Sequence, residues 1–275
     1  MDVGFYATAG PLTTLAPDHV EMISRLDLDP PGLCLLAQGL LISPMGAASA
    51  RLAKERMTEV NIRPASALLE RVLELDGTTP LNELRSAERR VVGTCRHYAA
   101  LATAFLRAMN VPARGRCGFA TYFVPPKKVD HWIVEYWSDD VQRWVRTDPE
   151  YVGRTTPAAS RPDDLRPGEF LSSGEAWQLI RSGADNPAEF GVFGTENWGP
   201  GEVRGNAMRD LASLVAKVEM LPWDEWGPMK DSYDGKTGDD FDALIDDYAA
   251  AAESDDGPTL QLTYDQLTVP AAMIC

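Results

Sequence analysis

The chain has 275 residues, of which 44% are hydrophobic, so it is long enough to bury a core as one large domain or two small ones. Its formal net charge is −15. This charge argues against nucleic acid and anionic membranes as partners, because both reward basic patches. Solubility is a sufficient explanation of the charge, although an acidic protein can also prefer a cationic substrate such as an amine.

The N-terminal segment and the cysteines predict a soluble, cytoplasmic protein with reduced thiols. Residues 1–15 lack the basic and apolar regions of a signal peptide. The longest apolar run, at 33–42, contains Gln38 and Gly39 and is too short to span a bilayer. The cysteines form no CxxC pair, and the histidines are too few for a ligand cluster, so no metal and no cofactor are expected. The cysteines are Cys34, Cys95, Cys117 and Cys275.

The first third of the chain is expected to be helical, because apolar residues recur there at helical spacing between turn signals. The helices are expected at 18–26, 33–41, 47–57 and 64–75. Gln38 lies inside the apolar helix, where a buried amide needs hydrogen-bond partners. It is either a satisfied core amide or a donor to an oxyanion in the active site.

A cysteine at the start of a helix is the strongest chemical signal in the sequence. Cys95 follows Gly93-Thr94 and precedes a helical pattern that Asn110 ends. In the first turn of a helix, free backbone N–H groups and the positive end of the dipole favour a thiolate and help to hold an oxyanion. His97 points away from Cys95 on a helix, and we expect it in a pocket or on the surface.

An antiparallel sheet is expected to pack on this helix, because three strand patterns follow it. They lie at 113–124, 131–137 and 141–147. His131 opens the second strand and Asp148 ends the third, so Cys95, His131 and Asp148 predict a nucleophile, its base and the group that orients the base. Each residue alone has a structural explanation, but the combination is far more specific. Trp132 is either a wall of the substrate groove or core packing.

This region resembles the core of the transglutaminase-like superfamily, which shares the papain-like Cys–His–Asp arrangement. The resemblance rests on Gly93-Thr94-Cys95 before an Ala- and Leu-rich helix, on the exit Val111-Pro112-Ala113-Arg114, on His131-Trp132 and on Asp148. The stretches RCGFATYF, DHWIVEYW, GEAWQLIRSG and KVEMLPWDEWG extend it over most of the chain, where it is similar to a bacterial group of stand-alone transglutaminase-domain proteins. The resemblance implies the fold and the triad, and no particular substrate.

Residues 151–275 are expected to elaborate this core with further elements. Helices are expected at 170–182, 206–220 and 241–248, a glycine-rich loop at 191–206 and a strand at 259–269. Trp198, Arg204 and Trp223 are expected either to line a specificity pocket or to anchor the C-terminal layer.

We therefore expect an α+β protein with a papain/transglutaminase-like core, as a single domain over 1–275. Residues 1–90 are its helical N-terminal part, 91–150 its catalytic core and 151–275 its C-terminal elaboration. The expected chemistry is an acyl-enzyme on Cys95, formed from an amide or a thioester and passed to an amine or to water. The acyl substrate is a small molecule, a peptide or a group bound to a carrier protein. The alternatives are purely hydrolytic amidase or peptidase activity, and a binding module that keeps the fold without turnover.

Overall fold

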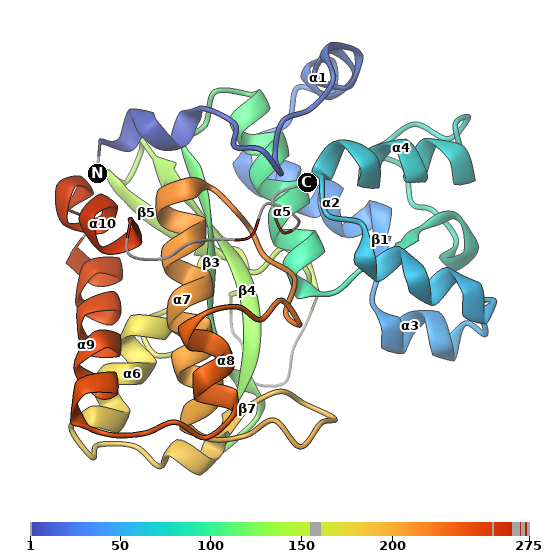
Figure 1. Ribbon diagram of the computed structural model, residues 1–275. Coiled ribbons are helices and arrows are strands. Elements are labelled where there is room, and N and C mark those ends of the chain that lie inside the picture. The colour runs from blue at the N-terminus through green and yellow to red at the C-terminus, as the bar shows by residue number, and fades with distance from the viewer. Residues whose placement is uncertain (1, 155–160, 255, 266–269, 271–272, 274–275) are drawn as a thin grey trace.

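The computed structural model describes residues 2–154, 161–254 and 256–265, together with 270 and 273 (Figure 1). Its helices are α1 (Pro17–Ser24), α2 (Pro30–Leu40), α3 (Pro44–Ser49), α4 (Ala65–Leu75), α5 (Cys95–Ala108), α6 (Ser173–Arg181), α7 (Pro200–Ala216), α8 (Pro228–Tyr233), α9 (Asp239–Ser254) and α10 (Gly257–Tyr264). Its strands are β1 (Leu41–Ile42), β2 (Val91–Val92), β3 (Ala113–Val124), β4 (Lys127–Ser138), β5 (Arg143–Thr147), β6 (Phe170–Ser172) and β7 (Phe190–Gly191). Short 3₁₀ helices lie at η1 (Val3–Ala7), η2 (Lys54–Asn61), η3 (Ala87–Arg89) and η4 (Pro187–Glu189). This mixture confirms the predicted α+β class.

The central sheet is built on the long hairpin β3–β4. Neighbouring strands in the order β5-β4-β3-β6 are antiparallel, and β7 runs parallel to β4. Gly118 of β3 pairs with His131 of β4, and Val134 pairs with Thr147 at the end of β5. Because antiparallel strands run past each other, Asp148 continues β5 towards the start of β4, where His131 lies.

Helix α5 packs against this sheet and is almost completely buried. Its apolar side chains share one core with Val134, Tyr136 and Val145 of the sheet and with residues of α2 and α4. The helix starts at Cys95 after a capping box formed by Thr94 and His97. The sequence predicts both this start and the stop at 110, and the stop follows from a left-handed residue after the last turn.

A second helical layer, formed by α6, α7 and α9, packs on the other flank of the sheet (Figure 1). Helix α7 runs along the part of β3 that β6 does not cover. Asp210 Oδ1 accepts a hydrogen bond from the Cys117 N–H at 2.9 Å, and the Ser213 hydroxyl donates to the Gly115 carbonyl at 2.8 Å. From α6, the Ser173 hydroxyl donates to the Cys117 carbonyl at 2.7 Å. These bonds satisfy backbone groups that an open sheet edge would leave unpaired.

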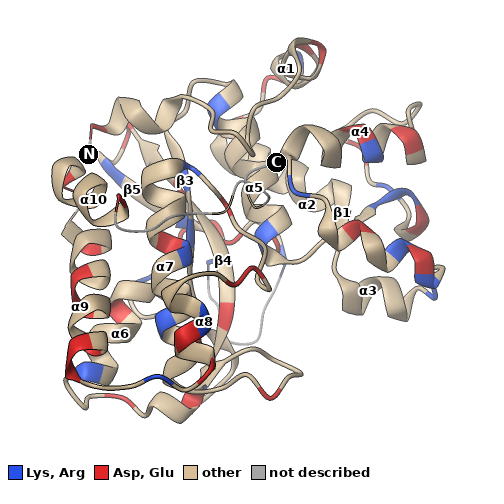
Figure 2. Cartoon of the chain, in the orientation of Figure 1, with Lys and Arg blue, Asp and Glu red and all other residues tan. Residues whose placement is uncertain are grey.

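Acidic side chains recur along the helices. Figure 2 shows Asp and Glu along α9, on α8 and on α4. The first turn of α9 carries Asp239, Asp240 and Asp242, where the positive end of the helix dipole favours them. No helix in the described part of the chain is long and apolar enough to cross a membrane.

Several expected elements have different bounds, and the first three residues of the expected helix at 170–182 form strand β6. The expected helix at 47–57 is divided into α3 and η2, because Arg51 adopts the left-handed region with φ 56° and ends the first of them. Helix α7 starts earlier than predicted, inside the expected glycine-rich loop. Gly199 has a φ of 110° and Pro200 follows it in the first turn, a position where proline costs no hydrogen bond.

The expected strand at 259–269 is wrong, because residues 257–264 form helix α10. Asp256 caps this helix by accepting a hydrogen bond from the Thr259 N–H at 3.2 Å. Leu260 is fully buried against the core formed by α7 and α9. The strand-like pattern of this segment is therefore outweighed by the helix cap and by tertiary packing. Residues 266–269 of the expected strand lie outside the described residues.

Candidate active site

Cys95 is placed by the short parallel pair β1 and β2. Ile42 lies opposite Val92, and both strands end there. Because parallel strands end at the same edge, segment 43–45 meets Cys95, and both line one cavity. Cys95 is partly exposed, whereas Cys34 is buried. A thiol at the first helical residue, open to a cavity, is suited to nucleophilic chemistry.

His131 lies between Cys95 and Asp148. Its Nε2 is 2.9 Å from Asp148 Oδ2, and its side chain lines the same cavity as the Cys95 thiol, with which it interacts electrostatically. Since Nε2 is used by Asp148, Nδ1 is the nitrogen left for the thiol. The Phe123 ring packs edge-on against the imidazole, with centroids 5.0 Å apart. The three residues predicted from the sequence are therefore neighbours in the structure, while their catalytic roles stay predictions.

Asp148 is held by a residue that the sequence reasoning missed. The Tyr122 hydroxyl donates to Asp148 Oδ2, and the Glu150 N–H donates to Oδ1 at 3.0 Å. Asp148 is fully buried, so these donors replace the water that its carboxylate loses. Strand alternation carried a signal for Tyr122, because it shares its parity with Gly118, which pairs with His131.

The electrostatics of the pair strengthen His131 as a base and at the same time raise the pKa of the Cys95 thiol. Burial lowers the pKa of His131, but the charge of Asp148 and the hydrogen bonds to Asp148 and Cys95 outweigh it and raise that pKa well above its ordinary value. Burial raises the pKa of the Cys95 thiol, the hydrogen bond to His131 opposes this rise, and the charges of Asp130 and Glu150 add to it. The imidazole is thus a strengthened base beside a thiol that needs one.

The cavity beside Cys95 has a volume of about 430 Å³ and a mainly apolar lining. Segment 43–45, the end of β3, the start of β4, the turn after Asp148 and the loop after β7 form its walls. The lining residues are Ser43, Pro44, Met45, Thr94, Cys95, Phe123, Val124, Val129, Asp130, His131, Glu150, Tyr151 and Phe193. An apolar pocket with few convergent polar groups is typical of a substrate site. Burial raises the pKa of the Glu150 carboxyl to about 7.

Two of the predicted substrate-binding residues lie outside this cavity. Trp132 is fully buried and packs with Ala99 and Cys117 beneath the site, so it is core packing. The Gln38 amide donates to the carbonyls of Glu150, at 3.2 Å, and of Val152. Its donors are thereby occupied, which corrects the expectation of an oxyanion donor. Gln38 instead fixes the turn after Asp148.

The three residues expected near a specificity pocket also lie elsewhere. Arg204 is buried, donates to Asp242 Oδ1 at 2.7 Å and ties α7 to α9. The Trp198 ring lies under the Lys127 ammonium group, 4.6 Å from its centroid, and Trp223 is 44% exposed. None of them lines the cavity beside Cys95. Arg204 therefore fits the alternative, an anchor of the C-terminal layer.

His97 is a buried capping residue, and the expectation of a pocket or surface position is wrong. Its Nδ1 accepts from the Thr94 N–H at 3.0 Å, and its Nε2 lies 3.1 Å from the Ile62 carbonyl. Burial, reinforced by the charge of Arg96, lowers the pKa of His97 to about 3. The neutral imidazole thus stabilises the start of α5, two residues after Cys95.

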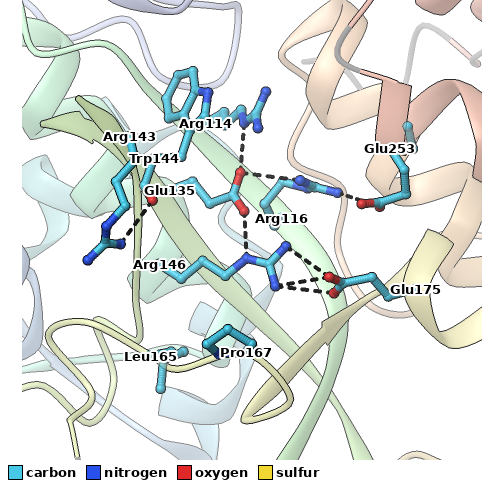
Figure 3. Close-up of a pocket in the computed structure, with 11 residues that line it drawn as sticks. Arg114, Arg116, Glu135, Arg143, Trp144, Arg146, Leu165, Pro167, Glu175 and Glu253 are labelled. Carbon is cyan, nitrogen blue, oxygen red and sulfur yellow. Dashed lines mark hydrogen bonds and ion pairs between the residues drawn. The ribbon is translucent and has the colours of Figure 1, made fainter. Parts of the chain in front are cut away.

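A second cavity, of about 370 Å³, lies over the charged end of the sheet. Figure 3 shows Glu135 at its centre, facing three guanidinium groups. Glu135 oxygens lie 2.8 Å from Arg114, 3.2 Å from Arg116 and 2.9 Å from Arg146, and Arg146 also pairs with Glu175 at 3.1 Å. Burial opposes the ionisation of Glu135, but the three arginines outweigh it and hold its pKa well below the usual range. These charges form ion pairs with one another, and the network therefore joins β3, β4, β5 and α6.

No cluster of three or more His, Cys, Asp or Glu side chains that could hold a metal ion occurs among the residues that the structure describes.

A family model described as the Transglutaminase-like superfamily matches residues 53–149, which include Cys95, His131 and Asp148. The match supports cysteine-dependent catalysis in general and does not distinguish acyl transfer from hydrolysis.

No curated protein matches the chain. Among solved structures, a provisionally named cysteine protease from Cytophaga hutchinsonii aligns with 18% identity and a TM-score of 0.22. The alignment covers 57% of this chain and 48% of that one, so it spans about half of that protein. A likeness at this TM-score bears on neither the fold nor the activity.

Proposed function

Residues 53–149 belong to the transglutaminase-like superfamily, and from this premise we propose that the chain is an enzyme that forms an acyl-enzyme on Cys95. The acyl group comes from an amide or a thioester and passes to an amine or to water. The observation that carries the proposal is the series Cys95, His131 and Asp148, in which His131 interacts with the Cys95 thiol and its Nε2 lies 2.9 Å from Asp148 Oδ2. It begins at a helix N-terminus that opens on an apolar cavity.

In the proposed reaction, His131 Nδ1 takes the proton of the Cys95 thiol while the sulfur attacks the carbonyl carbon. Asp148 stabilises the imidazolium that forms. The oxyanion of the tetrahedral intermediate lies near the first turn of α5, whose backbone N–H groups and dipole favour negative charge. The imidazolium then protonates the leaving amine or thiol, and the carbonyl re-forms as a thioester on Cys95. An amine or water attacks this thioester with His131 again acting as base, and the thiol is restored.

The experiment that tests the proposal is intact-mass spectrometry of the full chain after incubation with separate pools of amides, peptides and carrier-protein thioesters. The wild type is expected to gain the mass of one acyl group, which hydroxylamine removes as a hydroxamate. Cys95→Ala is expected to gain nothing, and Cys275→Ser, a matched loss of one thiol, is expected to behave like the wild type. Acylation or turnover by Cys95→Ala would contradict the proposal.

The fate of the acyl group is read from the products. When an amine is added to the acylated wild type, an amide product identifies a transferase. Free acid in the presence of excess amine identifies a hydrolase, because water then outcompetes the amine in the closed site.

A further inference from the structure

Two carboxyl groups line the cavity beside Cys95, and none of its described lining residues is a lysine or an arginine. Asp130 directly precedes His131 in β4, and its Oδ1 accepts a hydrogen bond from the Asn206 amide at 2.6 Å. Glu150 follows Asp148 in the turn after β5. The charge of the buried Arg209 also acts on Asp130, whereas the proposed reaction gives Glu150 no task, so the place of Glu150 beside the sulfur needs another explanation.

Glu150 is held by backbone hydrogen bonds and is one of the residues that line the cavity. Its N–H donates to Asp148 Oδ1 at 3.0 Å, and its carbonyl accepts from the Gln38 amide at 3.2 Å. Among the described residues, no group donates a hydrogen bond to its carboxylate. The charges that act on it are those of His131, Asp148 and Arg154, and Arg154 does not line the cavity. A partly buried carboxylate is costly unless a ligand brings positive charge to it.

The rim of the same cavity is apolar and exposed. Met45 is 67% exposed, Val124 43% and Phe193 58%. They come from three separate segments, the start of α3, the end of β3 and the loop after β7. Exposed apolar side chains that gather at one cavity are typical of a surface that a ligand covers.

We propose that Glu150 and Asp130 bind one positively charged group of the substrate beside Cys95, while Met45, Val124 and Phe193 hold an apolar part of the same molecule. The ligand class is an ammonium or guanidinium group joined to an apolar body, as in a peptide with a basic residue beside an apolar one. This inference rests on the proposed function, because it names the substrate of the same site.

The site also couples binding to the state of the nucleophile. The charges of Asp130 and Glu150 both contribute to the raised pKa of the Cys95 thiol. A bound cation offsets these charges, so it lowers that pKa and favours the thiolate. The substrate that fits the site therefore helps to ionise the sulfur that attacks it.

The test uses thiol reagents that share a methanethiosulfonate group, carry head groups of opposite charge and need no acyl substrate. They are the positive 2-(trimethylammonium)ethyl methanethiosulfonate and the negative 2-sulfonatoethyl methanethiosulfonate. Each forms a mixed disulfide with the thiolate and releases methanesulfinate. Rates at Cys95 are measured on the full chain by peptide-resolved mass spectrometry at about pH 8, above the pKa of about 7 of Glu150. Because both reagents react with the same thiolate, the ratio of their rates does not depend on the thiolate fraction. This ratio is divided by the same ratio measured for 2-mercaptoethanol, which removes the intrinsic difference in reactivity between the reagents.

The positive reagent is expected to react roughly tenfold faster or more, given the energies of unit charges at short range in a partly buried site. Glu150→Gln is expected to lower the ratio at least about threefold. Glu196→Gln removes the same charge from an exposed position in the loop that carries Phe193, and is expected to leave the ratio unchanged. Asp130→Asn, which keeps a side-chain oxygen for Asn206, is expected to lower the ratio as well.

A ratio near one in the wild type, or a ratio that survives both Glu150→Gln and Asp130→Asn in folded protein, overturns the cation site. A high ratio in a chain that no acyl donor modifies would instead contradict the proposed function. The rate ratio of the wild type alone shows whether the surroundings of Cys95 favour positive or negative charge, so the test does not depend on the folding of a variant.

Discussion

At the scale of the residue, the candidate site depends on Asp148, because three groups converge on its buried carboxylate. His131 lies 2.9 Å from Oδ2, the Tyr122 hydroxyl bonds to the same oxygen, and the Glu150 N–H donates to Oδ1. These bonds fix the carboxylate where it raises the pKa of His131 and orients the ring. The strength of the base is thus set by its partner.

Asp148→Asn tests this dependence, because it keeps the shape of the side chain and removes its charge. The pKa of His131 is expected to fall, so that the imidazole takes the Cys95 proton less readily. Alkylation of Cys95 by iodoacetamide near neutral pH should slow roughly tenfold or more, since one pKa unit is a factor of ten. Asp140→Asn, exposed in the turn between β4 and β5, is the control. Equal alkylation rates in Asp148→Asn and the wild type would contradict the role of Asp148.

At the scale of the element, the site depends on a close approach of two strands at Gly118. This residue pairs with His131 on one side and with Ser172 of β6 on the other. A Cβ atom at Gly118 would lie 2.2 Å from the Leu171 carbonyl oxygen, which is backbone and cannot turn away. The glycine therefore permits β6 to pair with β3 directly beside His131.

Gly118→Ala is expected to push β6 away from β3 and to lower the free energy of unfolding by about 1–3 kcal/mol, as overpacking does. Gly39→Ala is the matched control, because a Cβ at Gly39 in α2 meets no atom within 4 Å. There alanine is expected to raise stability by up to about 1 kcal/mol, since it favours the helix. Urea denaturation of both variants checks the opposite signs. A Gly118→Ala variant as stable as the wild type would show that β6 is not needed.

At the scale of the whole molecule, distant segments of the chain are tied together around α5. The Arg63 guanidinium group bonds both oxygens of Asp224, at 2.6 and 2.8 Å, across the molecule from the N-terminal helices to the segment after α7. The Arg63 carbonyl also accepts from Arg96, next to Cys95, at 2.8 Å. The cavity beside Cys95 is likewise formed by distant segments, because Met45 and Phe193 both line it.

A double-mutant cycle with Arg63→Met and Asp224→Asn is expected to give a coupling energy of about 1–3 kcal/mol, because the bidentate pair is mostly buried. The exposed pair of Glu21 in α1 and Arg25 directly after it is the control, with an expected coupling below about 0.5 kcal/mol. Urea denaturation of each variant supplies the free energies. A coupling no larger than that of the exposed pair would mean that other contacts close the molecule.

The sequence by itself determined the elements whose signals are local. Helix α5 was predicted from its cap, its apolar spacing and its stop, and the strands from alternation, because each of these depends on neighbours along the chain. The order of Cys95, His131 and Asp148 at the ends of these elements was enough to place them together, since a helix on an antiparallel sheet leaves few other arrangements. Their catalytic roles stay predictions that the experiments above test.

Only the tertiary structure decided which side chains face the cavity. Gln38 bonds to carbonyls more than a hundred positions away, Trp132 is sealed beneath the site, and Arg204 pairs with Asp242 instead of a ligand. Tyr122 and Glu150, which contact Asp148, were not predicted as site residues. The physical reason is that tertiary packing brings distant segments together and thereby decides whether a polar or aromatic side chain is buried, hydrogen-bonded or exposed to the cavity. A local sequence pattern contains no information about these distant contacts.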